Sequence, residues 1–332
     1  GCPIAHTDRY GGVWLPLTHE MVHEIAYDTD HFSSEGPVVG QLKPSEVPDR
    51  IGAPIGPVPP ISSDPPFHAE ARRLLLPAFS PKKIDPWREE VIEICNKLID
   101  DMGDANHIDA ALQYSQHIPV MVSARMLGLP VEDGDRFRGW VNLVLSGIGE
   151  ERTEERMAKF EEFNQYLAYH VNDHMENPRE DLISFLLNAE IMGQKLSLEH
   201  AVGTVILLLI AGIDTTWSGI GSSLWHLASN SVDRRRLVEN PDMIPAAIEE
   251  FLRAYAPVTM ARIVKEDMEF HGVQMKQEDW VLLPFPAANR DDKQFEDAHI
   301  VQIDREENRH AAFGLGIHRC LGSNLARLEM NV

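Results

Sequence analysis

The longest apolar run in the sequence, "VILLLIAGI" from Val205 to Ile213, lies within a helical pattern that extends from about Leu198 to Asn230. A membrane-spanning helix needs about 20 consecutive apolar residues, and this run stops at Asp214, so no membrane span is predicted. Leu207 to Ile210 are apolar on every side of a helix, which is typical of a helix buried in a protein core. The sequence therefore predicts a long buried helix in a domain without a membrane segment.

The rest of the chain has the pattern of helices followed by short strands. Thr18 opens a helical stretch that runs to Thr29, with apolar residues at helical spacing. Helical spacing resumes at Pro66 and continues to Pro257, with breaks at Gly103–Asp104 and Gly128–Pro130. Beyond Pro257, alternating and β-branched residues predict short strands with a turn at Gly272. The predicted fold class is mainly α with small β-sheets.

Positions 36 to 66 differ from both patterns because they are crowded with Pro and Gly, which break regular structure. A loop this long inside a compact domain is usually functional or disordered. Apolar residues are interleaved with the loop's Pro and Gly, which indicates a loop packed on an apolar surface. These residues are Val38, Val39, Ile51, Ile55 and Val58.

The formal net charge of −22 argues against nucleic acid as a partner, because binding to phosphates requires a basic surface. Cys2, Cys95 and Cys320 are far apart and odd in number, which argues against a disulfide framework and is typical of a reducing compartment. The first residues do not combine a basic region with an apolar one, so no signal peptide is predicted. We expect a cytoplasmic protein.

The buried helical segment carries two features that a core helix ordinarily avoids. Asp214 places a carboxyl group there, and an unpaired buried charge is costly. Gly212, Gly219 and Gly221 each weaken a helix by about 1 kcal/mol relative to alanine. Thr215 can hydrogen-bond its own backbone and help to open a turn. Two interpretations follow: a loosened helix that presents an acid and an alcohol to a cavity, or a small-residue helix crossing with a satisfied aspartate.

Two further helical stretches carry charged side chains at helical spacing. Glu250 and Arg253 in "EEFLR" lie one turn apart and can form a salt bridge, with Arg305 as a candidate third member. Most such pairs are solvated and contribute little, but apolar neighbours favour a buried structural pair here. His68 and Arg72 in "DPPFHAEARR" share a helix face and can both donate to an anion, unless the stretch is an ordinary surface helix.

The stretch "AAFGLGIHRCLGSNLA", from 311 to 326, places a single cysteine, Cys320, in a glycine-rich loop before a helical run. A cysteine nucleophile needs a nearby base; His318 is close in sequence, but no further catalytic pattern follows. A zinc site needs about four closely spaced ligands, which are lacking, and an inert buried cysteine is the commonest alternative. The glycines favour instead a backbone that approaches a flat ligand and directs N–H groups at the sulfur. A thiolate without companion protein ligands suits haem, whose porphyrin supplies the other donors.

Four stretches of the chain resemble the motifs of cytochromes P450, in that family's order. The loop from Phe313 to Gly322 is similar to the cysteine-ligand motif F-G-x-G-x-H-x-C-x-G. "AGIDTT", which begins at Ala211, resembles the oxygen-activating helix motif, and Glu250 to Arg253 resemble the E-x-x-R motif. "DPPFHAEARR" resembles the helix that contacts the haem propionates. The matches span positions 64 to 322, and the lack of a membrane anchor indicates the soluble bacterial type.

The resemblance implies a role for each matching residue. Cys320 is the thiolate ligand of the haem iron, and the bulky porphyrin lies against the glycine-rich loop. Asp214 and Thr215 are the catalytic residues and deliver protons through water. Four basic residues bind the propionates: His68, Arg72, Arg262 and His318. The residues implied in contacting the haem are His68, Arg72, Ala211, Arg262, Phe313, Gly314, His318, Cys320 and Gly322.

The resemblance also assigns structural, docking and substrate-binding segments. Glu250, Arg253 and Arg305 hold the region beneath the haem. The stretch from Glu70 to Arg88 has a local charge of +3, which alone indicates only a solvated helix face. By resemblance, its helix carrying Arg72 and Arg73 lies on the cysteine side, where redox partners dock. The basic residues expected to meet an acidic partner are Lys82, Lys83 and Arg88. The segments expected to line the substrate pocket are 36 to 62, 143 to 165 and Pro257 to Met260.

The function implied by the resemblance is that of a haem-thiolate monooxygenase, with haem b (iron protoporphyrin IX) as cofactor and O2 as co-substrate. Two electrons come from NAD(P)H through ferredoxin and its reductase, or through a fused flavin or iron–sulfur reductase domain. The expected reaction is hydroxylation or oxidative dealkylation of a small apolar or aromatic molecule by a monomeric protein. A peroxide-driven P450 and a non-catalytic haem-binding protein are the alternatives, and Asp214 with Thr215 argues against both.

The domain prediction is a single haem domain over residues 1–332. Chains of the resembled family usually begin earlier and continue for several dozen residues beyond the cysteine loop. We therefore expect this sequence to lack an N-terminal and a C-terminal segment of the family's domain.

Overall fold

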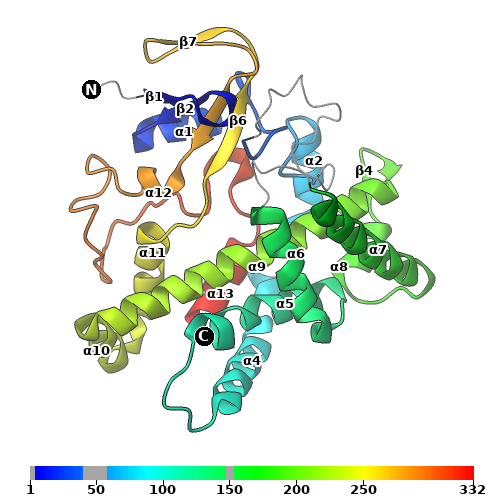
Figure 1. Ribbon diagram of the computed structural model, residues 1–332, viewed down its shortest axis with the longest axis vertical. Helices are drawn as coiled ribbons and strands as arrows, with labels where there is room; N and C mark the ends of the chain where they lie inside the picture. Colours follow the sequence, from blue (N-terminus) through cyan, green and yellow to red (C-terminus); the bar gives the residue numbers. More distant parts are fainter. Residues whose placement is uncertain (1–3, 40–57, 147–152) are drawn as a thin grey trace.

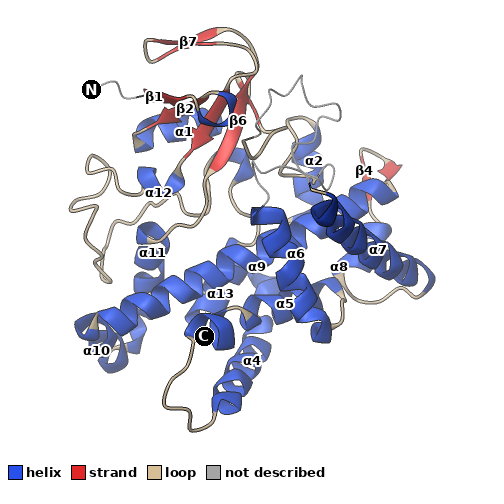
Figure 2. Cartoon of the chain, in the orientation of Figure 1, coloured by secondary structure: helices blue, strands red, loops and turns tan. Residues whose placement is uncertain are grey.

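The computed structural model describes residues 4–39, 58–146 and 153–332, and helices dominate this part of the chain (Figure 2). The helices are α1 (His19–Tyr27), α2 (Phe67–Leu75), α3 (Pro81–Ile84), α4 (Trp87–Met102), α5 (His117–Leu127), α6 (Gly134–Ser146), α7 (Glu154–Glu176), α8 (Leu182–Leu187), α9 (Leu198–Ser229), α10 (Ser231–Glu239), α11 (Ile244–Ala254), α12 (Phe285–Ala288) and α13 (Ser323–Asn331). The strands are β1 (Ile4–Thr7), β2 (Val13–Pro16), β3 (Phe32–Ser33), β4 (Glu190–Ile191), β5 (Gln194–Lys195), β6 (Met260–Val264), β7 (Met268–Phe270), β8 (Val273–Met275) and β9 (Trp280–Leu283). The predicted fold class is confirmed.

The long buried helix predicted from the apolar run is α9, which crosses the middle of the molecule (Figure 1). The Ser197 side chain caps its first turn by accepting a hydrogen bond from the His200 N–H. Leu209 and Ile213 are fully buried in the largest apolar cluster, to which α5, α6, α7 and α8 also contribute. The helix continues without a break, so the turn that Thr215 was expected to open stays closed.

By length and composition alone, α9 is also the one helix among the described residues that could cross a membrane, with an 18-residue window of mean hydropathy 1.6. The core helix of a globular domain meets the same criteria. Contacts of α9 with α5, α6, α8, α11 and α13 are those of a central core helix. The packing therefore accounts for the apolar composition of α9.

A mixed sheet lies to one side of α9, in the strand order β1-β2-β9-β6-β3 (Figure 1). The β2–β9 pair is parallel and the other pairs are antiparallel. The strands predicted beyond Pro257 are confirmed as β6 to β9, and the turn at Gly272 joins β7 to β8 with a φ of 81°. The pattern did not predict β1, β2 and β3.

Helix α1 packs against this sheet and confirms its prediction. The Thr18 side chain accepts a hydrogen bond from the Met21 N–H at 3.3 Å, and the apolar face of α1 is buried. Val264, Val281 and other sheet residues complete the same apolar cluster. The helix is thus fixed to the sheet, beside the cysteine-containing loop that it also contacts.

The proline-rich loop is described at both of its ends, and positions 40–57 lie outside the described residues. Val39 and Val58 are each 8% exposed, and Val58 belongs to the same core cluster as Leu209 of α9. The Pro59 carbonyl accepts a hydrogen bond from the Thr204 hydroxyl of α9 at 3.2 Å. The prediction of a loop packed on an apolar surface is confirmed for these residues.

Candidate functional site

The loop that carries Cys320 folds back on itself immediately before α13. The Cys320 N–H donates to the Phe313 carbonyl at 2.7 Å, which closes the loop. Gly314 and Gly316 have φ values of 69° and 67°, in the left-handed region that favours glycine. A Cβ at Gly316 would stand 2.2 Å from the Ala26 carbonyl oxygen of α1. Glycine is required there both for its φ and for the close approach of two backbones.

Cys320 lies deep in the protein and nevertheless has exposed surface. Burial raises the pKa of the thiol, and the Gly322 N–H, which donates to the sulfur, opposes this effect. The guanidinium groups of Arg72, Arg319 and Arg327 also favour the thiolate. The expected N–H directed at the sulfur is therefore present.

Four basic residues from three elements meet beside this loop. His68 and Arg72 come from α2, Arg262 comes from β6, and His318 belongs to the loop itself. The ring centroids of His68 and His318 are 4.1 Å apart. Burial, with Arg72, lowers the pKa of His68 to about 4, and burial, with Arg262 and His68, lowers the pKa of His318 to about 2. Both imidazoles are therefore neutral at pH 7.

The cluster holds more donors than acceptors. Among the described residues, the Nε2 atoms of His68 and His318 are buried without a hydrogen-bond partner. Arg262 is 4% exposed and donates to the Ala261 carbonyl, and burial lowers its pKa to about 10. Leaving buried donors unsatisfied is costly, so the cluster fits a ligand that brings anionic oxygens. The donor set matches the two carboxylates of haem, and Cys320 matches its axial ligand.

The middle of α9 also has an open side. Ala211 is exposed, although Leu209 and Ile213 on either side of it are fully buried. The Thr215 hydroxyl donates to the Ala211 carbonyl at 2.9 Å. Burial raises the pKa of Asp214, and a hydrogen bond from the Trp217 side chain opposes that rise. The helix thus has the open face of the first interpretation and the hydrogen-bonded aspartate of the second, and its backbone is not loosened.

The cysteine loop and α9 are joined by the residues that follow Cys320. Leu321 packs on the core clusters that contain Ile213 and Ile220 of α9. Helix α13 packs directly on α9 as well. The thiol, the basic cluster and the acid–alcohol pair therefore belong to one connected region of the fold.

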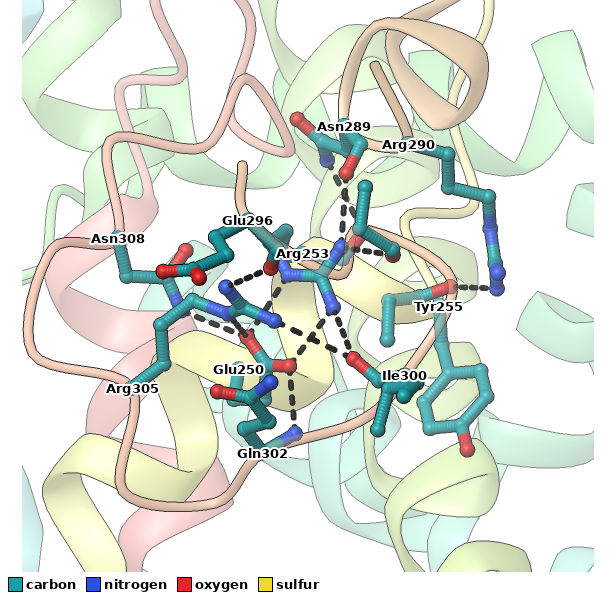
Figure 3. A network of polar contacts seen from close by, with 12 residues as sticks. Glu250, Arg253, Tyr255, Asn289, Arg290, Glu296, Ile300, Gln302, Arg305 and Asn308 are labelled. Atoms are coloured by element: carbon teal, nitrogen blue, oxygen red, sulfur yellow. Dashed lines mark hydrogen bonds and ion pairs between the residues drawn. The ribbon is translucent and has the colours of Figure 1, made fainter. Parts of the chain in front are cut away.

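The predicted pair Glu250–Arg253 is fully buried and bidentate (Figure 3). Arg253 donates from Nε and Nη2 to the two Glu250 oxygens at 2.8 and 2.7 Å. Arg305 Nε donates to Glu250 Oε2 at 3.0 Å and is the expected third member. Arg253 also donates to three backbone carbonyls, those of Asn289, Ala298 and Ile300. The network ties α11 to the segment that leads to the cysteine loop.

A second ion pair next to this network was not predicted. Glu249 accepts hydrogen bonds from Arg327 of α13 at 2.6 and 2.8 Å, and its Oε2 lies 3.1 Å from His310 Nε2. The Arg327 guanidinium stacks 4.4 Å from the Phe313 ring centroid. Because Glu249 and Arg327 are 78 residues apart, no local spacing could reveal the pair. This contact fixes Phe313, the first residue of the cysteine motif.

Other predicted site segments are only partly described. Helix α6 ends at Ser146 and α7 begins at Glu154, so positions 147–152 of the expected pocket segment 143 to 165 lie outside the described residues. Two contacts of the site residues were not predicted from the sequence. One is Trp217 on Asp214, whose i,i+3 spacing could have shown it. The other is Arg72, whose guanidinium donates to the Arg319 carbonyl of the cysteine loop.

Comparison with protein families gives a match to the model described as "Cytochrome P450", over residues 109–242 and 233–332. The polyketide biosynthesis cytochrome P450 PksS of Bacillus subtilis is 35% identical over 274 residues, which is 82% of this chain and 67% of that protein. The mycinamicin IV hydroxylase/epoxidase of Micromonospora griseorubida is 32% identical over 324 residues, which is 96% of this chain and 79% of that protein. The crystal structure of CYP109E1 from Bacillus megaterium with testosterone superposes with a TM-score of 0.87 at 33% identity, covering 99% of this chain and 84% of that one.

Proposed function

The chain belongs to the cytochrome P450 family of haem-dependent monooxygenases, and from that premise we propose that it hydroxylates or oxidatively dealkylates a small apolar or aromatic molecule. The observation that carries the proposal is a set of groups in one region: a lone thiol, four basic side chains of which two have a buried ring nitrogen without a partner, and an acid–alcohol pair on an open helix face. Bound haem supplies the iron at which O2 is reduced with two electrons.

In this proposal four side chains hold the cofactor through its carboxylates. Arg72 and Arg262 provide charged donors, and His68 and His318 provide neutral imidazole N–H groups. Cys320 provides the thiolate ligand, assisted by the Gly322 N–H at its sulfur. The remaining residues proposed to contact haem are Ala211, Phe313 and Gly314.

Asp214 and Thr215 are proposed to handle protons on the opposite side of the site. The Thr215 hydroxyl proton points to the Ala211 carbonyl, so its oxygen is free to accept a hydrogen bond from water. The raised pKa of Asp214 keeps a larger fraction of its carboxyl protonated near neutral pH, which suits a proton donor. Together the two groups would move protons from solvent toward the reacting oxygen atoms.

The finer features of the reaction are proposals as well. Electrons would come from NAD(P)H through a ferredoxin and its reductase, or through a fused flavin or iron–sulfur reductase domain. Residues 1–332 would form part of one haem domain, acting as a monomer in the cytoplasm. The relatives named above include a hydroxylase/epoxidase, which supports insertion of oxygen into an organic substrate.

The first experiment is an absorption spectrum of the reduced protein with carbon monoxide. A thiolate-ligated haem gives a characteristic red-shifted Soret band, and we expect it in the wild type and its loss in Cys320→Ala. Cys95→Ala is the matched control, since Cys95 is a buried thiol of α4 outside the cysteine loop. An unchanged Soret band in Cys320→Ala would refute the assignment of the ligand.

The second experiment separates the proposed oxygenase from the alternatives. Thr215→Ala should keep NAD(P)H consumption but divert electrons from product to peroxide, because the hydroxyl is lost from the proton route. Turnover is compared with NAD(P)H plus partner proteins and with hydrogen peroxide alone. Efficient turnover with peroxide alone, unaffected by Thr215→Ala, would favour a peroxide-driven enzyme. Spectral binding of haem without any turnover would favour a haem-binding protein.

A further inference from the structure

Glu249 of α11 binds residues on both sides of the cysteine loop. In the segment that leaves the loop, Arg327 of α13 donates to its two carboxylate oxygens from Nε and Nη2, at 2.6 and 2.8 Å. In the segment that enters the loop, His310 Nε2 lies 3.1 Å from Glu249 Oε2. Cys320 lies between these two partners in the sequence. One carboxylate therefore joins the segments that enter and leave the loop.

The direction of the His310 hydrogen bond follows from the other nitrogen of its ring. The Ala312 N–H donates to His310 Nδ1 at 3.1 Å, so Nδ1 is an acceptor and Nε2 carries the ring proton. Nε2 then donates to Glu249, and the His310 side chain is only 3% exposed. His310 is thus fixed between α11 and the first residues of the cysteine loop.

The Arg327 side of the pair leads to the backbone of Cys320. The Arg327 guanidinium stacks 4.4 Å from the Phe313 ring centroid, and Phe313 also packs against the apolar cluster that contains Ile248 of α11. The Phe313 carbonyl accepts the Cys320 N–H at 2.7 Å. A guanidinium bound by both oxygens of a carboxylate is fixed in its plane. Glu249 therefore sets the orientation of the group that covers Phe313.

Glu249 and Glu250 are neighbours on α11 but bind different partners. Because an α-helix has about 3.6 residues per turn, their side chains point in directions about 100° apart. Glu250 belongs to the fully buried network with Arg253 and Arg305. Glu249 and Arg327 are each 30% exposed in their side chains. Substitution of Glu249 therefore leaves no fully buried charge alone, and we expect its variants to fold.

We propose that Glu249 is a positioning residue for the thiolate ligand, which holds the entering and leaving segments of the cysteine loop together and keeps Cys320 in place. The proposal rests on the proposed role of Cys320 as the ligand of haem. Glu249 acts through His310 and Arg327 and not by contact with the sulfur. The protein without this carboxylate still folds but loses the thiolate ligand more easily.

The test uses Glu249→Ala in the haem-loaded protein. The Soret band of the reduced carbon monoxide complex reports thiolate ligation, and circular dichroism reports the helices; both are followed through one urea titration. We expect the thiolate-type Soret band of Glu249→Ala to disappear at a lower urea concentration than the helix signal. Before unfolding, the ratio of thiolate-free to thiolate-bound haem should rise about three- to tenfold over the wild type, since a partly solvated ion pair is lost.

Glu90→Ala is the matched control. Glu90 pairs with Arg125 between α4 and α5, and the two side chains are 31% and 36% exposed, close to the values for Glu249 and Arg327. We expect this control to keep the thiolate-bound fraction of the wild type. An equal rise of thiolate-free haem in the two variants would mean a general loosening of the protein and would overturn the proposal.

Substitutions of the two partners test whether they act through Glu249. Arg327→Lys keeps the positive charge but loses the planar fork that binds both oxygens, and His310→Leu removes the other donor. Each should raise the thiolate-free fraction alone and add little in the Glu249→Ala background, because the shared contact is already absent. If either substitution has the same effect in both backgrounds, the partners act independently of Glu249 and the proposal is wrong.

The outcomes separate this proposal from the assignment of the ligand. If the wild type gives no thiolate-type Soret band, Cys320 is not the ligand and both are wrong. If the wild type gives the band and Glu249→Ala loses it together with the helix signal, only the role of Glu249 is overturned. Should Glu249→Ala fail to fold, Glu249→Gln keeps the size and one acceptor, and its thiolate-free fraction decides in the same way.

Discussion

The side chain of Arg253 has no exposed surface. Its charge can be buried because each of the three guanidinium nitrogens donates to an acceptor. Two acceptors are the Glu250 oxygens and three are backbone carbonyls of the segment between α12 and the cysteine loop. A buried ion pair is neutral or weakly stabilising as a whole, but removing one partner leaves a buried charge alone. Each member of this network is therefore far less replaceable than a surface charge.

Arg253→Ala should lower the free energy of unfolding by about 3 to 5 kcal/mol, because Glu250 would lose its bidentate partner in the core. Urea unfolding followed by circular dichroism measures the change. Lys97→Ala is the control, since Lys97 pairs with Asp101 on the surface of α4 and should contribute little. Equal effects of the two substitutions would contradict the structural role of the network.

The lowered pKa of Glu249 predicts how the stability of the protein depends on pH. Burial raises its pKa, but hydrogen bonds from Arg327 and His310 outweigh burial and lower the pKa to about 2. A carboxyl whose folded pKa is lowered stabilises the fold above its ordinary pKa, and this stabilisation is lost as pH falls toward the folded value. Wild type should therefore lose stability between about pH 4.5 and pH 2 more steeply than Glu249→Gln. Parallel profiles in urea unfolding at several pH values would refute this.

At the scale of elements, the cysteine loop is shaped by its contact with α1. Gly316 brings the loop backbone so close to α1 that no side chain fits, and α1 is in turn fixed to the sheet. The loop is closed from the other side by Arg327, which holds Phe313 and is anchored by Glu249 of α11. The geometry of the thiol thus depends on α1, α11 and α13 together.

Gly316→Ala should destabilise the protein and reduce the haem content per chain, because the new Cβ meets a backbone carbonyl that cannot move freely. Gly272→Ala is a matched control: Gly272 has a φ of 81° but open space around it. Gly272→Ala should lower the free energy of unfolding by about 1 to 2 kcal/mol, because alanine disfavours the left-handed backbone conformation. Gly316→Ala should cost more, as measured by urea unfolding and by the ratio of Soret to protein absorbance. Similar effects for both would show that the close approach to α1 is unimportant.

At the scale of the whole molecule, a chain with net charge −22 has exposed basic residues on α3, close to the helix that follows Cys320. Lys82 and Lys83 are exposed on α3, and α3 packs against α13, which follows Cys320. Arg88 donates to Asn331 at the end of α13. A basic area on an acidic protein attracts acidic partners and repels basic ones, which favours an acidic electron donor at this side.

Charge reversal at Lys82 and Lys83 should slow electron transfer from an acidic ferredoxin and weaken the salt dependence of the rate, because attraction at long range is lost. Stopped-flow reduction over a range of ionic strength measures both. The control is the double reversal of Lys265 and Lys276, which changes the net charge equally but lies at the ends of strands β6 and β8. If the two double variants behave alike, the docking surface is not on α3.

Much of the local structure was accessible from the sequence. The apolar run predicted α9, the Thr18 cap predicted α1, and β-branched alternation predicted β6 to β9, because each depends on residues near one another in the chain. The short strands β1, β2 and β3 were missed: β2 and β3 pair with the distant strands β9 and β6, and β1 pairs with β2 alone. Of the two interpretations of α9, the loosened turn at Thr215 was wrong, because core packing on several sides keeps the helix regular.

The sequence by itself determined which chemical groups are present and in what order: the lone thiol among glycines, the acid–alcohol pair and the E-x-x-R pair. Only the tertiary structure decided which of them meet. It brought Arg262 of β6 to two histidines from distant segments and joined Glu249 to Arg327. The physical reason is that spacing fixes neighbours along a helix or strand, whereas contacts across the chain depend on how complete elements pack and which buried polar groups they must satisfy.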